Sequence, residues 1–143
     1  MKSILVDAGP LIALFDRDDK YHEAVMDFLR KYNGRLVTTW PVITEVTHLL
    51  SFNVHVQINF LEWLRRDAVE IINIEHQHID RIIQLSEKYA DIPMDLADAS
   101  LIVIAELTGI NDIISIDNDY FIYRTKSKKA LNNLLLPYIR DKL

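Results

Sequence analysis

Residues 3–10, SILVDAGP, decide the fold that we expect for this chain. The apolar run at 4–6 does not alternate with polar residues, which is typical of a strand buried on both faces of a parallel sheet. The run ends at Asp7, and Pro10 suits the first turn of a helix. A buried strand that passes at once into a helix predicts an α/β unit.

Strand-like and helix-like segments alternate along the rest of the chain. Short apolar runs predict further strands at 36–39, 69–74 and 112–116, with 121–123 as a candidate fifth strand. Helical spacing of apolar residues predicts helices near 10–16, 20–32, 41–50, 55–66, 79–85 and 95–108. Gly109 is suited to end the last of these helices. This alternation predicts a mainly parallel sheet of four to five strands between helices.

The composition is that of an ordinary globular protein. The 143 residues are 50% hydrophobic and 26% charged, and we expect one domain that spans 1–143. There is no cysteine, which excludes disulfides and zinc sites built from thiolates and fits a reducing cytoplasm. The first residues reach Asp7 too early for a signal peptide, and no apolar run has the roughly 18 residues that span a bilayer. We therefore expect a cytoplasmic protein.

The net charge of −5 argues against a non-specific nucleic-acid binder, which usually carries excess positive charge. That argument weakens if acids gather around metal ions, because the ions invert the local charge. Basic residues available for a polyanion are Arg65, Arg66, Arg124, Lys126, Lys128 and Lys129. The competing interpretation is that they form a solvated face.

Four acids occupy positions that mark them out, and we call them the acid quartet: Asp7, Glu45, Asp98 and Asp117. Asp7 and Asp117 end predicted strands, and ligands of such sheets gather beyond the carboxyl ends of strands. Glu45 and Asp98 lie within apolar helical stretches. Acids brought together raise one another's pKa, and a divalent cation with oxygen ligands relieves the repulsion. The quartet therefore predicts metal-assisted chemistry on a phosphate-containing substrate.

Each acid also has a plainer interpretation. Asp7 and Asp117 can cap a helix or shape a turn, and Glu45 can be an exposed helical residue. Asp95 can be an N-cap, and the charge of Asp98 can interact favourably with the helix dipole. Asp98 argues most strongly for function, because the helix that follows it is apolar nearly all round. The five histidines form no site, and no nucleophile triad or glycine-rich phosphate loop is present.

Four blocks in order carry a family resemblance: residues 6–11, 38–45, 94–100 and 115–121. Each block contains one member of the acid quartet. With these blocks the chain resembles the PIN-domain ribonucleases and, within them, the VapC-type toxins of toxin–antitoxin pairs. The fourth block departs from the family, which commonly has Thr where this chain has Ser115. The departure is conservative because both residues offer a hydroxyl.

The resemblance implies a three-layer α/β/α PIN-like sandwich and a metal-dependent endoribonuclease. It implies that the acid quartet holds Mg²⁺ or Mn²⁺, with Asp95 and Asp119 as accessory acids and Ser115 orienting the acids. It also implies RNA as substrate, and a homodimer and a small antitoxin as partners; the short apolar runs predict no membrane partner. The residues proposed to hold flanking phosphates are Arg17, Lys20, Arg124 and Lys126.

Two other functions compete with a nuclease. A non-catalytic RNA-binding or protein-interaction module on the same fold is the alternative, and the loss of a quartet acid would favour it. A phosphate-accepting receiver is disfavoured, because a single Asp followed by Gly9 and Pro10 ends the first strand. The apolar residues available either for a partner or for the core are Leu49, Leu50, Phe52, Phe60 and Trp63.

Overall fold

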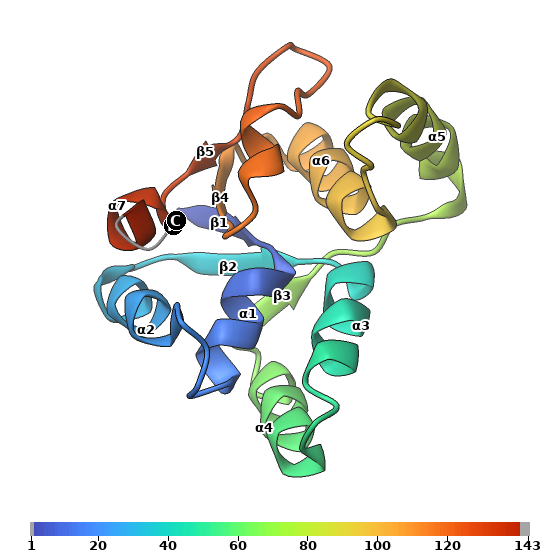
Figure 1. The fold of residues 1–143 in the computed structure, drawn as a ribbon. Helices are drawn as coiled ribbons and strands as arrows, with labels where there is room; N and C mark the ends of the chain where they lie inside the picture. The colour runs from blue at the N-terminus through green and yellow to red at the C-terminus, as the bar shows by residue number, and fades with distance from the viewer. Residues whose placement is uncertain (1, 141–143) are drawn as a thin grey trace.

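A computed structural model describes residues 2–140, so Met1 and 141–143 at the ends of the predicted domain lie outside the described residues. Within this range one parallel sheet has the strand order β3-β2-β1-β4-β5 (Figure 1). Its strands are β1 (Ser3–Val6), β2 (Arg35–Thr38), β3 (Val69–Ile71), β4 (Asp112–Ile114) and β5 (Asn132–Asn133). The predicted parallel sheet is confirmed.

The central strand β1 is the one quoted first from the sequence. Leu5 pairs with Val37 of β2 on one side and with Ile113 of β4 on the other. Residues 4–6 are completely buried, as their apolar run predicts. Thr38 adds a side-chain bond to the ladder, because its Oγ1 donates to the carbonyl of Val6 over 2.8 Å.

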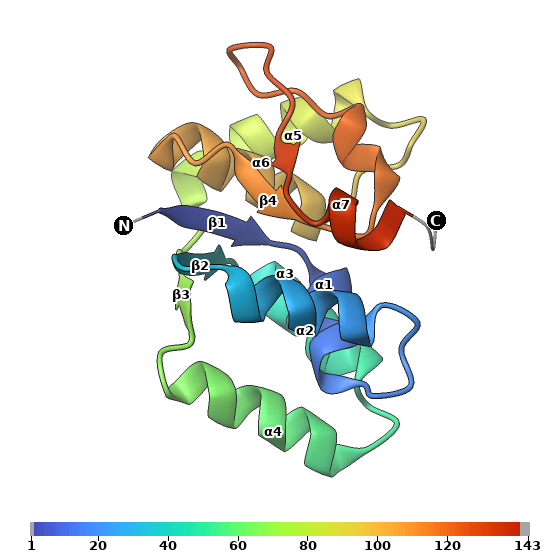
Figure 2. The same ribbon diagram turned by 90° about the vertical axis from the view of Figure 1, so that its left-hand side faces the viewer.

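The helices form layers on both sides of the sheet. They are α1 (Ala8–Phe15), α2 (His22–Lys31), α3 (Trp40–Leu49), α4 (Val54–Arg65), α5 (Ile79–Lys88), α6 (Leu96–Thr108) and α7 (Leu136–Ile139). Figures 1 and 2 show α1 to α4 on one side of the sheet and α5 and α6 on the other. The predicted three-layer α/β/α architecture is therefore confirmed.

The strand order explains where a ligand can enter. From β1 the chain proceeds outward to β2 and β3, and then returns across the sheet to β4 on the other side of β1. Right-handed crossovers require α1 to α4 and α5 to α6 to cover opposite faces. The carboxyl ends of β1 and β4 thus meet where the order reverses, which is the usual place for a binding crevice in such folds.

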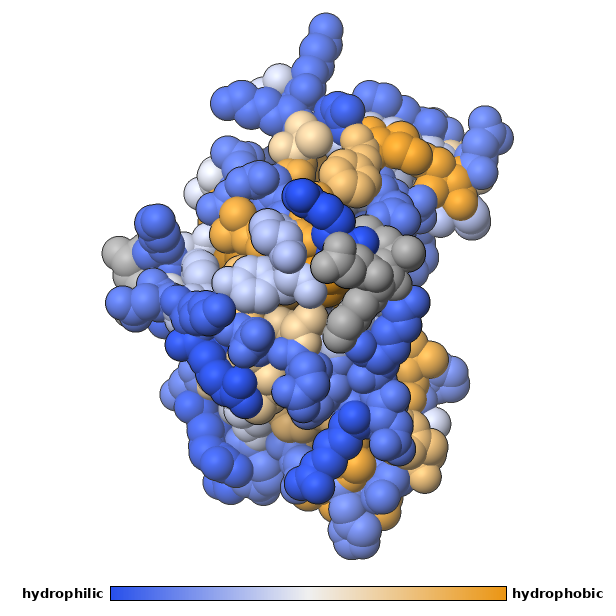
Figure 3. All heavy atoms as spheres, turned by 60° about the vertical axis from the view of Figure 1, so that its left-hand side comes forward, coloured by the Kyte–Doolittle hydropathy of each residue, from blue (hydrophilic) through white to orange (hydrophobic). Residues whose placement is uncertain are grey.

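The core is continuous, and α6 contributes much of it. Residues 101–105 of this helix are at most 2% exposed, which agrees with their apolar sequence. Gly109 ends the helix in a left-handed conformation with φ of 76°. The face in Figure 3 is mainly hydrophilic, with its apolar residues in scattered groups. No helix within residues 2–140 is both long and apolar enough to cross a bilayer.

The prediction of a strand at 121–123 is wrong. Asp117 instead caps a short 3-10 helix, η2 (Asn118–Phe121), and the chain turns without pairing there. Only Tyr123 of these three residues is buried, so the apolar run does not reflect a strand inside the sheet. The fifth strand is β5, two asparagines that join the sheet edge through backbone bonds to β4.

Candidate metal centre

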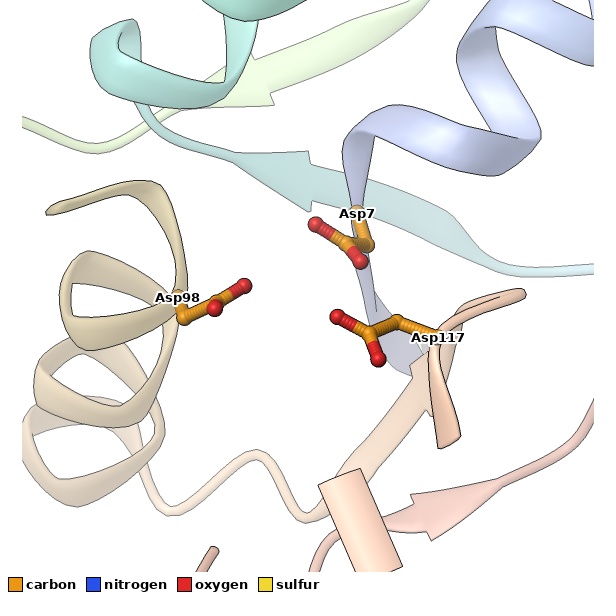
Figure 4. Close-up of side chains that lie close together, drawn as sticks. All are labelled: Asp7, Asp98 and Asp117. Atoms are coloured by element: carbon orange, nitrogen blue, oxygen red, sulfur yellow. The ribbon is translucent and has the colours of Figure 1, made fainter. Parts of the chain in front are cut away.

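Three carboxylates meet at the carboxyl edge of the sheet. Asp7 directly follows β1, Asp117 lies just beyond β4, and Asp98 projects from the first turn of α6. One carboxylate oxygen from each residue lies within 4.8 Å of the other two. Figure 4 shows the three side chains pointing toward one another, and we call them the acid triad.

The acid triad lines a cavity of about 280 Å³ together with Glu45 and Asp95. All four members of the acid quartet therefore reach one cavity, although Glu45 stands outside the close group of three. Asp119 is not among the described residues that line it. Its backbone N–H donates to Asp117 Oδ1 over 2.9 Å, so it contacts the site through that residue.

A buried serine hydroxyl joins the two acids that follow the strands. Ser115 Oγ donates to Asp7 Oδ2 over 2.9 Å and accepts from the backbone N–H of Asp117 over 3.0 Å. The side chain of Asn133, in β5, holds Ser115 in turn. Asn133 Oδ1 accepts from the Ser115 N–H over 3.2 Å, and Asn133 Nδ2 donates to the Ser115 carbonyl over 2.8 Å. Ser115 thus fixes the separation of Asp7 and Asp117, whereas the part played by Asn133 had no signal in the sequence.

The structure shows which of these acids cap a helix, as their plainer interpretation suggests. Asp7 is the N-cap residue of α1, but its side chain makes no cap bond and faces Ser115 instead. Asp117 both caps η2 and belongs to the acid triad. Asp95 is an N-cap as expected: its side chain accepts from the N–H of Asp98 over 2.8 Å.

Asp98 is held from two directions. Its Oδ2 accepts from the backbone N–H of Asp95 over 3.4 Å, completing a capping box at the start of α6. Tyr120 donates to Oδ1 over 3.3 Å and Tyr123 donates to Oδ2 over 3.1 Å. Sequence reasoning gave neither tyrosine a role: it placed Tyr123 in the candidate strand 121–123 and treated Tyr120 only as part of the fourth block.

Glu45 approaches the cavity from α3, which a buried bond ties to α6. Thr39, the N-cap residue of α3, shares a hydrogen bond of 2.7 Å with Ser100 of α6. Glu45 lies on the second turn of α3 and is half-buried, unlike Asp7 and Asp98. Glu45 therefore keeps more contact with solvent than the two buried acids.

The buried acids are costly to ionise. Burial raises the pKa of Asp7 to about 7, although hydrogen bonds from the Ala8 backbone and Ser115 oppose the rise. Burial also raises the pKa of Asp98 to about 7, and the charges of Asp7 and Asp95 add to that effect. The pKa of Glu45 is raised by burial and then by Asp95 and Asp117. These carboxyls strongly favour a neighbouring positive charge.

The residues of the cavity fit a hard divalent cation. The ion pairs found within residues 2–140 join Arg30, Arg35, Arg65 and Arg81 to acids outside the acid triad. The donor set consists of carboxylate oxygens, which Mg²⁺ and Mn²⁺ accept, and it lacks the nitrogen or sulfur ligands typical of zinc. Charge and donor chemistry thus agree with the ion expected from the sequence.

The basic residues expected to hold phosphates differ in how free their charged groups are to bind a substrate. Arg124 Nη1 donates to the carbonyls of Phe121 and Tyr123 over 2.5 and 2.9 Å, so its guanidinium is engaged with its own loop. Arg17 and Lys126 are exposed. Lys20 is also exposed, with its ammonium 5.1 Å from the ring centre of Tyr21.

The apolar residues that were open to either a partner or the core divide in the structure. Leu50 and Phe60 are completely buried, and Trp63 packs against the core. Leu49 and Phe52 are 50% and 62% exposed. These two remain available for a partner.

Comparisons of sequence and of fold find similar proteins of the same kind. The PIN domain family profile matches residues 4–127. "Ribonuclease VapC26" of Mycobacterium tuberculosis (strain ATCC 25618 / H37Rv) is 27% identical over 120 residues, which cover 82% of this chain and 89% of that protein. The crystal structure of Mycobacterium tuberculosis VapC20, described as a sarcin–ricin loop cleaving toxin, superposes with a TM-score of 0.75. It is 16% identical, and the match covers 83% of this chain and 93% of that one.

Proposed function

The chain belongs to the PIN domain family, and we propose that it is a Mg²⁺- or Mn²⁺-dependent endoribonuclease that hydrolyses RNA phosphodiester bonds. The observation that carries the proposal is the acid triad, whose oxygens lie within 4.8 Å of one another although its members lie far apart in the sequence. The likeness to a protein named as a ribonuclease supports the choice of RNA.

The chain's own residues would hold the ion and keep its ligands in place. Asp7, Asp98 and Asp117 would be the ligands, with Glu45 as the fourth acid of the site. When bound, a divalent ion lowers the pKa of a water molecule and offsets the charge that develops on the phosphate. Ser115 keeps Asp7 and Asp117 in place, and the capping box keeps Asp98 at the start of α6.

Glu45 and the accessory acids would act around this centre. Glu45 lines the cavity but stands outside the close group of three, so it can face the substrate or a water molecule. Asp95 lines the same cavity, and Asp119 adds negative charge next to Asp117. One of these acids would also accept a proton as the general base.

The biological setting is part of the same proposal. We extend the proposal to a cytoplasmic toxin that acts as a homodimer and is neutralised by a small antitoxin, as the family resemblance of the sequence implies; VapC20, whose fold this chain shares, is named as a toxin. Exposed apolar side chains on α3, on α4 and between them offer contact surface for such partners: Leu49, Phe52, Val54, Ile58 and Leu61. One sheet and one continuous core support a single domain.

Replacement of one triad acid tests the proposal. Asp98→Asn keeps the size of the side chain and should remove Mg²⁺- or Mn²⁺-dependent RNA cleavage while the protein stays folded. Asp80→Asn is the matched control, because Asp80 is an exposed acid in the first turn of α5. Chelation with EDTA should stop cleavage by the unmodified protein, and Mn²⁺ should restore it.

The outcomes separate the proposal from its alternative. Cleavage by a folded, nuclease-free Asp98→Asn preparation at the unmodified rate would defeat the assignment. RNA binding without any cleavage by the unmodified protein would instead support the non-catalytic RNA-binding module. Activity that persists through chelation would exclude the metal-dependent mechanism.

A further inference from the structure

Two buried tyrosine hydroxyls converge on one carboxylate of the acid triad. Tyr120 and Tyr123 donate to the two different oxygens of Asp98, over 3.3 and 3.1 Å. Their side chains are only 2% and 0% exposed, so water does not compete for these hydroxyls. A buried tyrosine hydroxyl needs a partner, and here both take the same carboxylate.

The segment that carries the tyrosines also carries another triad acid. Asp117 begins η2, Tyr120 lies within that short helix, and Tyr123 follows it. The segment 117–123 therefore contributes one carboxylate to the site and binds a second one, which belongs to α6. Its conformation sets the separation of Asp117 and Asp98.

The rings have little freedom to follow a moving carboxylate. Tyr120 and Tyr123 meet edge to face, with ring centres 5.2 Å apart and planes at 85°. Tyr89 packs on the other side of Tyr123 with ring centres 5.0 Å apart. The Tyr89 hydroxyl is directed away from Asp98 and accepts from the backbone N–H of Arg124 over 2.8 Å.

We propose that Tyr120 and Tyr123 are positioning residues that fix the Asp98 carboxylate for a divalent cation and so favour Mg²⁺ over a larger ion. The inference rests on the proposed function. Asp98 Oδ1 accepts a hydrogen bond from Tyr120 alone and so keeps a lone pair for the ion, whereas Oδ2 accepts from both Tyr123 and the Asp95 N–H. Mg²⁺ demands near-octahedral oxygens at about 2.0–2.1 Å, whereas Ca²⁺ tolerates flexible ligands at about 2.3–2.6 Å. A carboxylate held at both oxygens meets the stricter demand.

Removal of the hydroxyls alone tests the role. Tyr120→Phe and Tyr123→Phe keep the rings, and each should weaken Mg²⁺ binding about 10-fold, with a loss approaching 100-fold for the double variant. Ca²⁺ binding should weaken less, so that the ratio of the Mg²⁺ and Ca²⁺ affinities falls. Both affinities are read from displacement of Mn²⁺ by electron paramagnetic resonance, without any RNA. If the double variant does not fold, the two single variants carry the test.

Tyr89→Phe is the matched control. It removes a hydroxyl from the same aromatic stack, but that hydroxyl contacts Arg124 and not Asp98. Its Mg²⁺ affinity should stay within about 2-fold of the unmodified protein. Tyr→Phe changes made in an Asp98→Asn background should likewise have no further effect, because the carboxylate that they position is gone.

The two proposals fail in different ways. An unmodified protein that binds neither Mg²⁺ nor Mn²⁺ would remove the proposed function and this inference with it. An unmodified protein that binds the ion, with tyrosine variants that bind it equally well, would overturn only the positioning role. Equal losses in Tyr89→Phe, or in the Asp98→Asn background, would also overturn it, because the effect would then come from general loosening.

Discussion

The two walls of the acidic cavity are built differently. On the sheet and α6 side, hydrogen bonds from Ser115, Tyr120 and Tyr123 hold two members of the acid triad. On the α3 side, Glu45 is half-buried and no side chain within residues 2–140 donates a hydrogen bond to it. One wall is thus fixed before any ligand arrives, whereas the other has a side chain that is free to adjust.

The difference matches two separate demands on the proposed nuclease site. An ion with strict geometry needs ligands that are already in place, because reordering them during binding lowers affinity. A substrate or a water molecule changes position during a reaction, and a carboxylate on a long side chain can follow it. We therefore expect changes on the fixed wall to alter ion binding and changes on the α3 wall to alter turnover.

The largest effect is expected from the fixed wall itself. Asp117→Asn keeps the cap of η2 but removes a charge from the acid triad. Loss of several kcal/mol of electrostatic stabilisation lowers the cleavage rate by about 10⁴-fold. Single-turnover cleavage of a labelled RNA measures it. Asp119→Asn, two residues away, should cost less than about 10-fold, and equal losses in the two variants would refute the distinction between triad and accessory acids.

Without an ion, the fixed wall should make the fold less stable as the pH rises. The pKa of Asp7 is about 7 in the folded state against 3.8 ordinarily, so the folded protein holds a proton that the unfolded chain releases between these values. Stability is therefore highest below pH 3.8 for this group and is lost as the pH rises through 7. The loss for Asp7 is up to about 4 kcal/mol, at about 1.4 kcal/mol per pH unit.

Urea unfolding in EDTA at pH 5 and pH 8 measures this loss. Asp7→Asn should remove only part of the slope, because Asp98, whose pKa is also raised to about 7, keeps its own contribution; it should also make the metal-free protein more stable at pH 8. Mg²⁺ should stabilise the unmodified protein more at pH 8 than at pH 5, because protons no longer compete with the ion. A slope that is the same in Asp7→Asn would show that other groups cause it.

The α3 wall gives the next prediction. Glu45→Gln should lower turnover about 100-fold, which is typical of a group that moves a proton or orders water. The affinity for Mn²⁺ should stay within about 3-fold, since Glu45 stands outside the close group of three acids. A loss of Mn²⁺ affinity as large as that of Asp98→Asn would place Glu45 among the main ligands and remove the contrast between the walls.

Much of the fold could be predicted from the sequence because it depends on local patterns. The apolar run at 4–6, the helix that ends at Gly109 and the strand–helix alternation all have short-range physical causes. The edge strand β5 could not be predicted, because two asparagines join the sheet through backbone bonds that any residue can make. The segment 121–123 was misassigned because its run of apolar residues is typical of a strand, whereas it forms the end of η2 and the chain that follows.

The acids of the site were easier to predict than the groups that hold them. A carboxylate at the end of an apolar strand is visible in the sequence, since parallel strands end at one edge of a sheet. Tyr120 and Tyr123 contact Asp98 across more than 20 positions, and Asn133 contacts Ser115 across 18. Such contacts depend on tertiary packing, which no spacing rule describes. Only Ser115 was expected, and only through the family resemblance.

The smallest effect is expected from Ser115, which joins the two acids on the fixed wall. Ser115→Ala removes the bond to Asp7 and the acceptor for the Asp117 N–H but leaves every carboxylate in place. Mn²⁺ affinity should fall about 10-fold, as when a group that orients a ligand is lost. Turnover at saturating Mn²⁺ should change by less than about 3-fold, because the ligands themselves remain.

Ser100→Ala is the control that separates the loss of the Ser115 hydroxyl from a general loss of packing. Both serines are completely buried, but Ser100 bonds to Thr39 and to the carbonyl of Ala97 and touches no acid of the site. Both variants should lose about 1–3 kcal/mol of unfolding free energy, because each leaves a buried polar group without its partner. Only Ser115→Ala should also lose Mn²⁺ affinity. If both lose it equally, the fixed wall owes its order to general packing and not to the hydroxyl between Asp7 and Asp117.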